Sequence, residues 1–344
     1  MVTRRGAIAF GVAAAFILSA SLFAQDRKTR EAQKREATAV YKILEGIDAG
    51  QPVPNDLSVE WAREDLLKAQ DNKQYVPFTI TLDPSKVNGR TVSLYWRVVD
   101  KTPAAPDEKA DKKADSKAPA FAYEDINLAQ LPGGQKGLAR ISRSFAVPGD
   151  SYDVYVVVKE PTPEKAPRNA PPLKVSVIKR TVEVPDLWTD ELNTSSVFVA
   201  ERIEPLPAPL TPEQQAERPY ALGGMELTPV LDTNFDKTAE LSTFLLIYNT
   251  KTDSSNKPDI TIEYNFYTKA EGAEKFFNKT NPQSLNAQTL PPQFDLAAGH
   301  QLQSGQAVPL ASFPAGEYRL EIKVTDKLAN KSLTRNVNFT VSGS

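Results

Sequence analysis

The chain of 344 residues contains one histidine, His300, and no cysteine, which limits the chemistry open to its side chains. One imidazole leaves a single histidine base for a Ser-His-Asp arrangement and excludes a metal site built from several histidines. The absence of cysteine excludes thiolate zinc ligands and cysteine nucleophiles. His300 stands in a polar segment, Ala-Gly-His-Gln, that is typical of a loop. We therefore expect His300 to be solvated and not catalytic.

Acidic residues near position 234 suggest a calcium loop at first sight. Asp232, Asn234 and Asp236 alternate in the way that oxygen ligands do at the start of such a loop. The sixth and twelfth positions of an EF-hand loop require glycine and glutamate, and this chain has Lys237 and Thr243 there. The pattern therefore favours a turn that leads into a strand.

A second acidic group comprises Asp186, Asp190 and Glu191. These carboxylates could supply the acid and base of glycoside hydrolysis, but nothing in their spacing fixes the separation that this reaction requires. The sequence has no nucleophile elbow and no dinucleotide fingerprint, and Gly133-Gly134 lacks the further glycine and the helix of a phosphate loop. We predict no catalytic, cofactor-binding or metal-binding residues, and we expect that the chain is not an enzyme.

The first 24 residues have the layout of a cleavable signal peptide. Arg4 and Arg5 give a positively charged start, an apolar stretch covers residues 7–18, and small residues lead to Ala24. The apolar stretch is shorter than the ~20 residues that span a bilayer, and charged sequence begins at Asp26. An uncleaved anchor is the alternative. We expect export to the periplasm or the cell exterior, with no transmembrane anchor in the mature chain.

The composition favours an extended, β-rich protein. The chain has 27 prolines against 16 glycines, and its formal net charge is −2 with both signs interspersed. Many prolines favour rigid, extended connections over long helices. Because binding to nucleic acid usually requires a large basic excess, we expect no nucleic-acid partner.

Residues 26–72 are predicted to form a helical segment. Gly50 and the prolines after it end a first helix, and Asn55 or Asp56 can cap a second one. In the first helix, one apolar face is formed by Val40, Ile43, Leu44 and Ile47. In the second, the corresponding face would be formed by Val59, Ala62, Leu66 and Ala69.

A change to period two near Tyr75 predicts an antiparallel β-sandwich domain over residues 75–185. The turn dipeptide Asn88-Gly89 suggests that its first two strands form a hairpin or a wider equivalent. The expected strands cover residues 75–82, 92–98, 152–158 and 174–184.

This domain is interrupted by residues 101–120, which consist mainly of Ala, Lys, Asp and Pro. The segment has no large apolar side chain before Phe121, so it cannot offset the entropy of ordering. We predict a disordered insertion. An interaction tail is the alternative for a charged run of this kind.

A second antiparallel β-sandwich domain is predicted for residues 186–344. The stretch 241–249 is nearly all apolar, which indicates a strand covered on both faces, whereas residues 260–266 alternate as a half-buried strand does. Near the C-terminus, alternating strands at 318–324 and 337–341 are predicted to form a hairpin, with residues 325–332 turning the chain between them.

The closing strands resemble those of known bacterial modules. Residues 313–326 read Phe-Pro-Ala-Gly-Glu-Tyr-Arg-Leu-Glu-Ile-Lys-Val-Thr-Asp, followed by Asn330 and by Val-Asn-Phe-Thr-Val at 337–341. They look like the closing strands of bacterial immunoglobulin-like and fibronectin-like modules, which usually have glycine where this chain has Ala329. The wider segment 195–249 is similar to the β-domain attached to exported bacterial proteins of the GWxTD type, although the GWxTD motif itself is absent. The resemblance implies an immunoglobulin-like fold and an exported protein.

Two β-sandwich modules outside the cytoplasm favour a non-enzymatic binding or envelope-structural protein that acts through protein-protein contacts. Its expected partner is another envelope or extracellular protein. Carbohydrate binding is the alternative function, and hydrolysis is a second alternative. Because fold alone does not imply function, the resemblance cannot decide between them.

The candidate binding face lies on the outward side of the first sandwich. Tyr95 and Arg97 on one strand and Tyr155 on another share the parity opposite to that of the core residues Trp96 and Val156. If these strands adjoin, the first three side chains form a platform of tyrosine and arginine, which recur at interface hot spots and can also stack on sugar rings.

An alternative stays open for this face. The N-terminal helices, with Ile43, Leu44 and Leu66, could cover it and make both tyrosines ordinary packing residues. The parity of the strands is the same in both cases, so the sequence alone cannot separate them.

The predicted signal peptide can be tested directly on exported protein. We expect the mature chain to begin near Gln25 or Asp26, because the small residues before them suit the signal-peptide cleavage site. Intact-mass spectrometry of protein recovered from outside the cytoplasm measures this. A mass that retains residues 1–24 would contradict cleavage and favour the uncleaved anchor.

Overall fold

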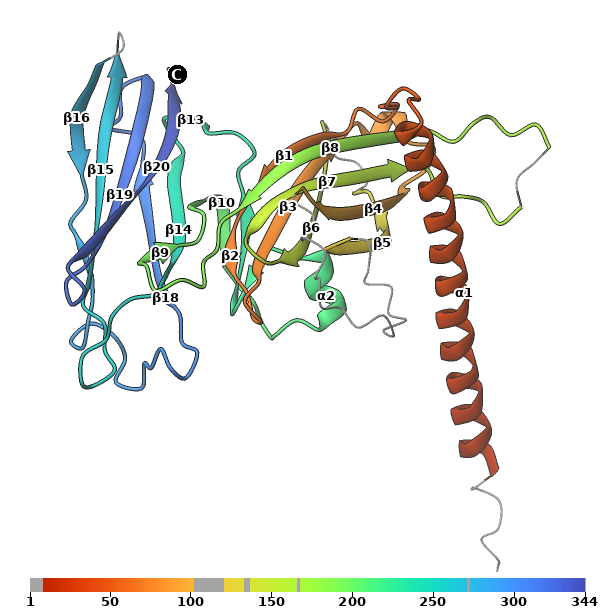
Figure 1. Cartoon of the computed structure of the whole chain (residues 1–344), viewed down its shortest axis with the longest axis horizontal. Coiled ribbons are helices and arrows are strands. Elements are labelled where there is room, and N and C mark those ends of the chain that lie inside the picture. The colour runs from red at the N-terminus through yellow and green to blue at the C-terminus, as the bar shows by residue number, and fades with distance from the viewer. Residues whose placement is uncertain (1–8, 102–120, 133–136, 166–167, 271–272, 344) are drawn as a thin grey trace, which may run out of the picture. The chain divides into compact units, whose positions relative to one another are not determined.

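The computed structural model describes residues 9–101, 121–132, 137–165, 168–270 and 273–343 (Figure 1). The chain is mostly β with several sheets, as the sequence predicts, and it begins with one helix that is longer than the predicted short helical segment. It forms two compact units, the first comprising residues 1–60, 81–140 and 152–182, and the second comprising residues 61–80, 141–151 and 183–344. The domain ranges 75–185 and 186–344 stay predictions. The expected insertion 101–120 lies outside the described residues from position 102 onward.

Helix α1 (Ala9–Asp48) contains the first predicted helix and ends where the glycine and proline signals place its end. Val40 and Leu44 on its predicted apolar face are buried, and Gly50 follows with a φ of +92° that favours glycine. Residues 1–8 of the predicted signal peptide lie outside the described residues. Among the helices described, none has a stretch long and apolar enough to cross a membrane.

The second predicted helix is wrong, because residues 60–68 form two strands. These are β1 (Glu60–Glu64) and β2 (Leu67–Lys68), which both pair with β3 (Gln74–Leu82). The Trp61 ring stacks on Phe78 of β3 with centroids 4.8 Å apart. Pairing with a neighbouring strand and this ring contact outweigh a helix-like spacing, whose intrinsic preference is weak.

In the first unit, a four-stranded sheet has the order β5-β4-β7-β8. Its strands are β4 (Thr91–Asp100), β5 (Tyr123–Gln130), β7 (Asp150–Lys159) and β8 (Val175–Val184). Helix α1 packs on one face of it through Val40 and Leu44, which cluster with Tyr95, Val157 and Val177. The predicted hairpin of residues 75–98 is wrong, because β3 and β4 belong to different sheets. The chain between them forms a 3-10 turn (Pro84–Lys86) instead of a tight connection.

A buried ion pair fastens α1 to this sheet. Glu36 on the helix is 2% exposed and Lys159 at the end of β7 is 1% exposed. The Lys159 ammonium donates to Glu36 Oε2 at 2.5 Å, to the Glu160 carbonyl at 2.8 Å and to Thr162 Oγ1 at 2.9 Å. The other carboxylate oxygen of Glu36 accepts from the Thr162 backbone N–H. All three ammonium protons have acceptors, which is the condition for a buried charge to be tolerated.

The second unit contains three sheets. One is formed by β1, β3, β2 and β6 (Ala139–Val147); the second has the order β11-β12-β10-β14-β18, with β9 also pairing β14; the third has the order β13-β20-β19-β15-β16, with β17 pairing β15. The strands of the second are β9 (Asn193–Thr194), β10 (Phe198–Pro205), β11 (Ala221–Leu222), β12 (Met225–Pro229), β14 (Glu240–Tyr248) and β18 (Leu302–Pro309). Those of the third are β13 (Asn234–Asp236), β15 (Ile260–Ala270), β16 (Ala273–Lys279), β17 (Gln283–Leu285), β19 (Gly316–Asp326) and β20 (Lys331–Ser342).

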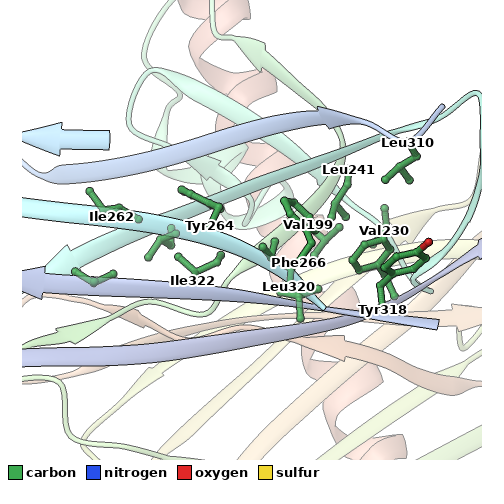
Figure 2. Close-up of a cluster of buried hydrophobic side chains, with 14 of the residues drawn as sticks. Val199, Val230, Leu241, Ile262, Tyr264, Phe266, Leu310, Tyr318, Leu320 and Ile322 are labelled. Carbon is green, nitrogen blue, oxygen red and sulfur yellow. The ribbon is translucent and has the colours of Figure 1, made fainter. Parts of the chain in front are cut away.

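The second and third sheets pack face to face as a sandwich. Figure 2 shows side chains of both sheets meeting in one core, with Val199 and Leu241 from the second sheet and Tyr264, Phe266 and Ile322 from the third. The predicted alternation is confirmed for β15, β19 and β20, whose inward residues are buried and whose intervening residues are more exposed.

Strand β14 is covered on both faces, as its apolar sequence predicts. Leu245 and Ile247 belong to the sandwich core. Phe244, Leu246 and Tyr248, on the opposite face, pack in a second cluster that includes Leu67, Phe198 and Tyr220. Residues 244–248 are apolar at every position and bury area on both sides of the strand, which adds to its stability at roughly 25 cal/mol per Å².

One connection contains a short helix, and another is tighter than the sequence predicts. The proline-rich stretch at 204–219 contains a short helix, α2 (Pro212–Glu217), which starts with a capping box between Thr211 and Gln214. The turn of the C-terminal hairpin is tighter than residues 325–332, because the ladder continues to the pair Asp326 and Lys331. Asn330 adopts a φ of +52° there, and Asp326 Oδ1 accepts two backbone N–H groups of the turn.

The alternation in β19 gives a stability prediction. Ile322 has no exposed surface, whereas its neighbour Lys323 points outward and makes only a 4.0 Å ion pair with Glu263. We expect Ile322→Ala to lower the free energy of unfolding by about 2–4 kcal/mol through the cavity it leaves, and Lys323→Ala by less than about 0.5 kcal/mol. Urea unfolding measures both. Equal losses would contradict the assigned faces.

The ion pair beneath α1 gives a second stability prediction. Lys159→Met leaves the Glu36 carboxylate buried without its cation, and we expect a loss of about 3–5 kcal/mol, most of which returns when Glu36→Leu is added. Lys179→Met is the matched control, since the Lys179 side chain is 53% exposed in its pair with Asp153, and surface pairs contribute about 0–1 kcal/mol. Equal losses in the two lysine variants would show that the buried pair is not an anchor.

Candidate ligand-binding pocket

A cavity of about 500 Å³ lies at the C-terminal end of β14, within the second unit. Its volume falls in the range of sites for small ligands, which is ~300–1,000 Å³. We call it the β14 pocket. It is lined by Lys68, Ala69, Gln70, Trp188, Ile247, Tyr248, Asn249, Thr250, Leu296, Gly299, His300, Gln301 and Leu302.

Trp188 forms one wall of the pocket and is 41% exposed, which is unusual for so large an apolar side chain. Its indole Nε1–H donates to the Lys73 carbonyl at 3.0 Å, and its backbone N–H donates to Asp186 Oδ1 at 2.8 Å. The Lys68 ammonium lies 4.0 Å from the ring centroid, in a cation–π contact. The ring is therefore held in place while much of it stays open to solvent.

Asn249 directly follows β14, and its backbone and side chain both help to form the pocket. Its φ of +60° turns the chain sharply, a conformation that asparagine tolerates better than most residues. Its side-chain amide donates to the carbonyls of Leu187 and Glu191, both at 3.0 Å. Its Oδ1 accepts from the Lys68 ammonium at 2.8 Å. The Asn249 side chain thus positions both the segment that carries Trp188 and the Lys68 ammonium that lies over the Trp188 ring.

The loop before β18 supplies the remaining wall. His300 Nδ1 accepts from the Asp295 backbone N–H at 3.0 Å, and the His300 N–H returns a bond to the Asp295 carbonyl at 3.2 Å. Because Nδ1 is an acceptor, the neutral ring carries its proton on Nε2, which can donate. Gly299 has a φ of +89° that lets the loop turn toward His300. His300 is exposed, as the sequence predicts.

The pocket has a positive electrostatic character. Lys68 is the charged residue in its lining, and no acidic residue lines it. Burial lowers the pKa of the Lys68 ammonium, and the nearby Asp186 carboxylate partly opposes this effect. An anion in the pocket would favour the charged lysine that burial disfavours.

Two of the polar groups that line the pocket hold its walls in place. The Asn249 amide and His300 Nδ1 are used to hold the walls. In the part of the chain that the structure describes, no group of three His, Asp or Glu residues has the arrangement of a metal site. What stays open is a fixed indole face, an ammonium and the imidazole Nε2, which together can bind an apolar group and accept an anionic or polar one.

The structure places the predicted platform in the first unit, away from any described cavity. Strands β4 and β7 do adjoin, with Arg97 paired to Tyr155 and Tyr95 paired to Val157. Tyr95 is only 1% exposed because α1 covers it through Val40 and Leu44. Its hydroxyl donates to Glu124 at 2.6 Å. Tyr95 is thus a packing residue, as in the alternative that the sequence leaves open.

Arg97 and Tyr155 stay partly exposed. The Arg97 guanidinium lies 4.8 Å from the ring centroids of both Tyr155 and Phe121, and its Nε has no hydrogen-bond partner among the described residues. Lys179 lies 5.2 Å from the Tyr155 ring. Tyr155 also packs against the buried cluster beneath α1. Two residues of the predicted platform therefore stay together at the surface, without Tyr95.

The candidate carboxylates have local structural roles. Asp186 caps the backbone at Trp188, and Glu191 pairs with Lys331 at 2.8 Å. Asp236 Oδ1 accepts from the N–H and hydroxyl of Thr238, and this bonding lowers the pKa of its carboxyl. Asp236 ends β13, and the turn that follows it leads into β14, where the sequence favours a turn over a calcium loop.

Sequence analysis missed Trp188 and Lys68. The signal that could have found Trp188 is its setting: a tryptophan in a polar, strand-free segment, Asp-Leu-Trp-Thr-Asp, has no alternation to bury it. No comparable signal exists for Lys68, because it lies 120 residues earlier in the chain and reaches the ring only through the fold.

No protein-family model and no curated protein matches the chain. Among solved structures, it is similar to Salmonella α2-macroglobulin reacted with methylamine, with 12% identity, a TM-score of 0.23, and coverage of 85% of this chain and 17% of that one. It is also similar to the native conformation of E. coli α2-macroglobulin (11% identity, TM-score 0.22, 85% and 16% covered) and to the E. coli protein activated by porcine elastase (11%, 0.23, 84% and 24%). The chain spans about a quarter or less of these structures, and the TM-scores are too low to indicate a shared fold.

Proposed function

We propose that the chain is an exported, non-enzymatic binding protein and that the β14 pocket holds its ligand. The observation that supports this most is Trp188, a large aromatic side chain that is fixed by hydrogen bonds yet 41% exposed beside a cavity. A rigid aromatic wall presents apolar area at little entropic cost, which is why such residues recur at binding sites.

The surroundings of Trp188 support binding more than catalysis. The polar side chains around it are engaged in positioning one another, as in the bonds from Asn249 to Leu187 and from Lys68 to Asn249. Preorganised walls lower the ordering cost of binding. The proposal of export is based on the signal-peptide layout of residues 1–24. The ligand of an exported protein would accordingly come from another envelope or extracellular protein.

Carbohydrate binding is the second candidate function. It is favoured by the same exposed indole, because sugar rings stack on flat aromatic faces. The Lys68 ammonium lies over the Trp188 ring, and 41% of the side chain is nevertheless exposed and could be covered by a sugar ring. A binding assay can separate the two candidates.

The test is a thermal-shift and calorimetric screen of the mature protein with neutral oligosaccharides, N-acetyl amino acids and short peptides. We expect at least one of these classes to bind the wild type and to lose about tenfold or more in affinity in Trp188→Ala, because truncating an aromatic anchor typically costs 2 kcal/mol or more, and about 1.4 kcal/mol is tenfold.

Phe276→Ala is the matched control, since Phe276 is 58% exposed and lies on β16, outside the pocket. This variant should bind like the wild type. If no class binds, or if Trp188→Ala binds as well as Phe276→Ala, the proposal that the pocket holds a ligand is overturned.

A further inference from the structure

We infer that the β14 pocket recognises a carboxylate next to an apolar group, the chemistry of a peptide C-terminus with an apolar last residue. This inference rests on the proposed function and specifies its ligand class. It follows from the charge, the free donors and the apolar surface of the pocket, taken in turn.

The charge of the pocket comes from Lys68. Its ammonium has three protons, and the structure gives it one acceptor among the described residues, Asn249 Oδ1 at 2.8 Å. The Trp188 ring lies against it at 4.0 Å. Asp186 acts on this lysine electrostatically but does not line the pocket. A ligand carboxylate can therefore accept a hydrogen bond from the Lys68 ammonium without displacing an acidic side chain from the lining.

Lys159, in contrast, is a buried lysine whose three ammonium protons all have hydrogen-bond acceptors. Its ammonium has acceptors on Glu36, Glu160 and Thr162. Lys68 is partly desolvated without that set of partners, since burial lowers the pKa of its ammonium. A partly desolvated cation with donor capacity left gains more from an anionic ligand than a saturated or fully hydrated one.

Other residues that line the pocket supply further donors. The neutral imidazole of His300 carries its proton on Nε2, because Nδ1 accepts from Asp295. Thr250 adds a hydroxyl at the end of β14. A carboxylate has two oxygens and can accept from more than one donor at once, whereas an amide offers a single oxygen. Lys68, His300 and Thr250 can thus each donate to a carboxylate in the pocket.

The apolar part of the ligand would lie on Trp188, Leu296 and the residues that form the pocket floor. Ile247 and Leu302 are 3% and 1% exposed and belong to the sandwich core, so the floor is rigid. The cavity of about 500 Å³ has room for one or two residues of a peptide. Apolar surface beside a lone cation suits a terminal residue such as leucine better than a polyhydroxylated sugar.

The inference is tested by isothermal titration of the mature protein with N-acetyl-leucine and with N-acetyl-leucinamide, which differ only at the carboxyl group. We expect the acid to bind at least about tenfold more tightly, since a charge-assisted hydrogen bond is worth roughly 1.5–3 kcal/mol. This comparison uses the unaltered chain, so its result does not depend on the folding of any variant.

The variant arm uses Lys68→Met, which keeps the apolar stem and removes the charge. We expect it to bind acid and amide equally, while Lys275→Met, at an exposed position on β16, keeps the wild-type preference. A peptide arm identifies the source of the carboxylate. If a hexapeptide ending in free leucine binds more tightly than N-acetyl-leucine, the ligand is a chain terminus, and equal binding indicates a small free carboxylate.

The outcomes separate this inference from the proposed function. If the amide or a neutral oligosaccharide binds as well as the acid, or if Lys68→Met keeps the preference for the acid, carboxylate recognition is overturned while the pocket stays a binding site. If no compound binds the wild type, both the carboxylate inference and the proposed function fail.

Discussion

Residues 244–248 of strand β14 have no face open to water, and the second unit depends on this constraint. Leu245 and Ile247 fill the core between two sheets, and Phe244, Leu246 and Tyr248 fill a second cluster on the other side. Layers on both sides are needed to bury such a strand, so its neighbours must assemble around it. After Thr243, β14 carries only apolar side chains up to Tyr248, and the next polar residue is Asn249, where the chain turns. The pocket forms at this point because the strand ends there.

The parts of the fold that the sequence predicts are those where local pattern and tertiary burial agree. In β15 and β19, every second residue is apolar and faces the sandwich core. Strand β6 has the same alternation in burial but places Arg143 at a buried position, 5% exposed, so its apolar pattern is interrupted. Strands β1 and β2 were predicted as a helix because their apolar spacing also fits period 3.6. Only pairing with β3 decides between the two, and that pairing is not a local property.

The site was less accessible to sequence reasoning than the fold. Parity correctly placed Tyr95, Arg97 and Tyr155 on one face of adjoining strands. Parity does not say what covers a face, and α1 covers Tyr95. The β14 pocket brings together Lys68, Trp188, Asn249 and His300 from segments more than fifty residues apart. Hydrogen bonds to backbone carbonyls hold Trp188 and Asn249 in place, and such bonds cannot be predicted from residue types. The composition excludes some chemistries, such as thiolate sites, but it does not predict which residues come together in a pocket.

The ionic groups of the chain differ in how fully their hydrogen-bonding capacity is used, and this difference separates structural groups from a binding group. Arg63 donates to both oxygens of Asp65 and to the carbonyls of Val197 and Val230. The Tyr220 hydroxyl also donates to the Asp65 carboxylate. A charge so fully partnered fixes its neighbours and has little left to offer a ligand. Lys68 has one acceptor among the described residues and an aromatic ring beside it. Partial burial removes water from the Lys68 ammonium, and the protein supplies only part of the hydrogen bonding that this water gave. A ligand that supplied the rest would be bound at the end of β14, the strand around which the second unit is built.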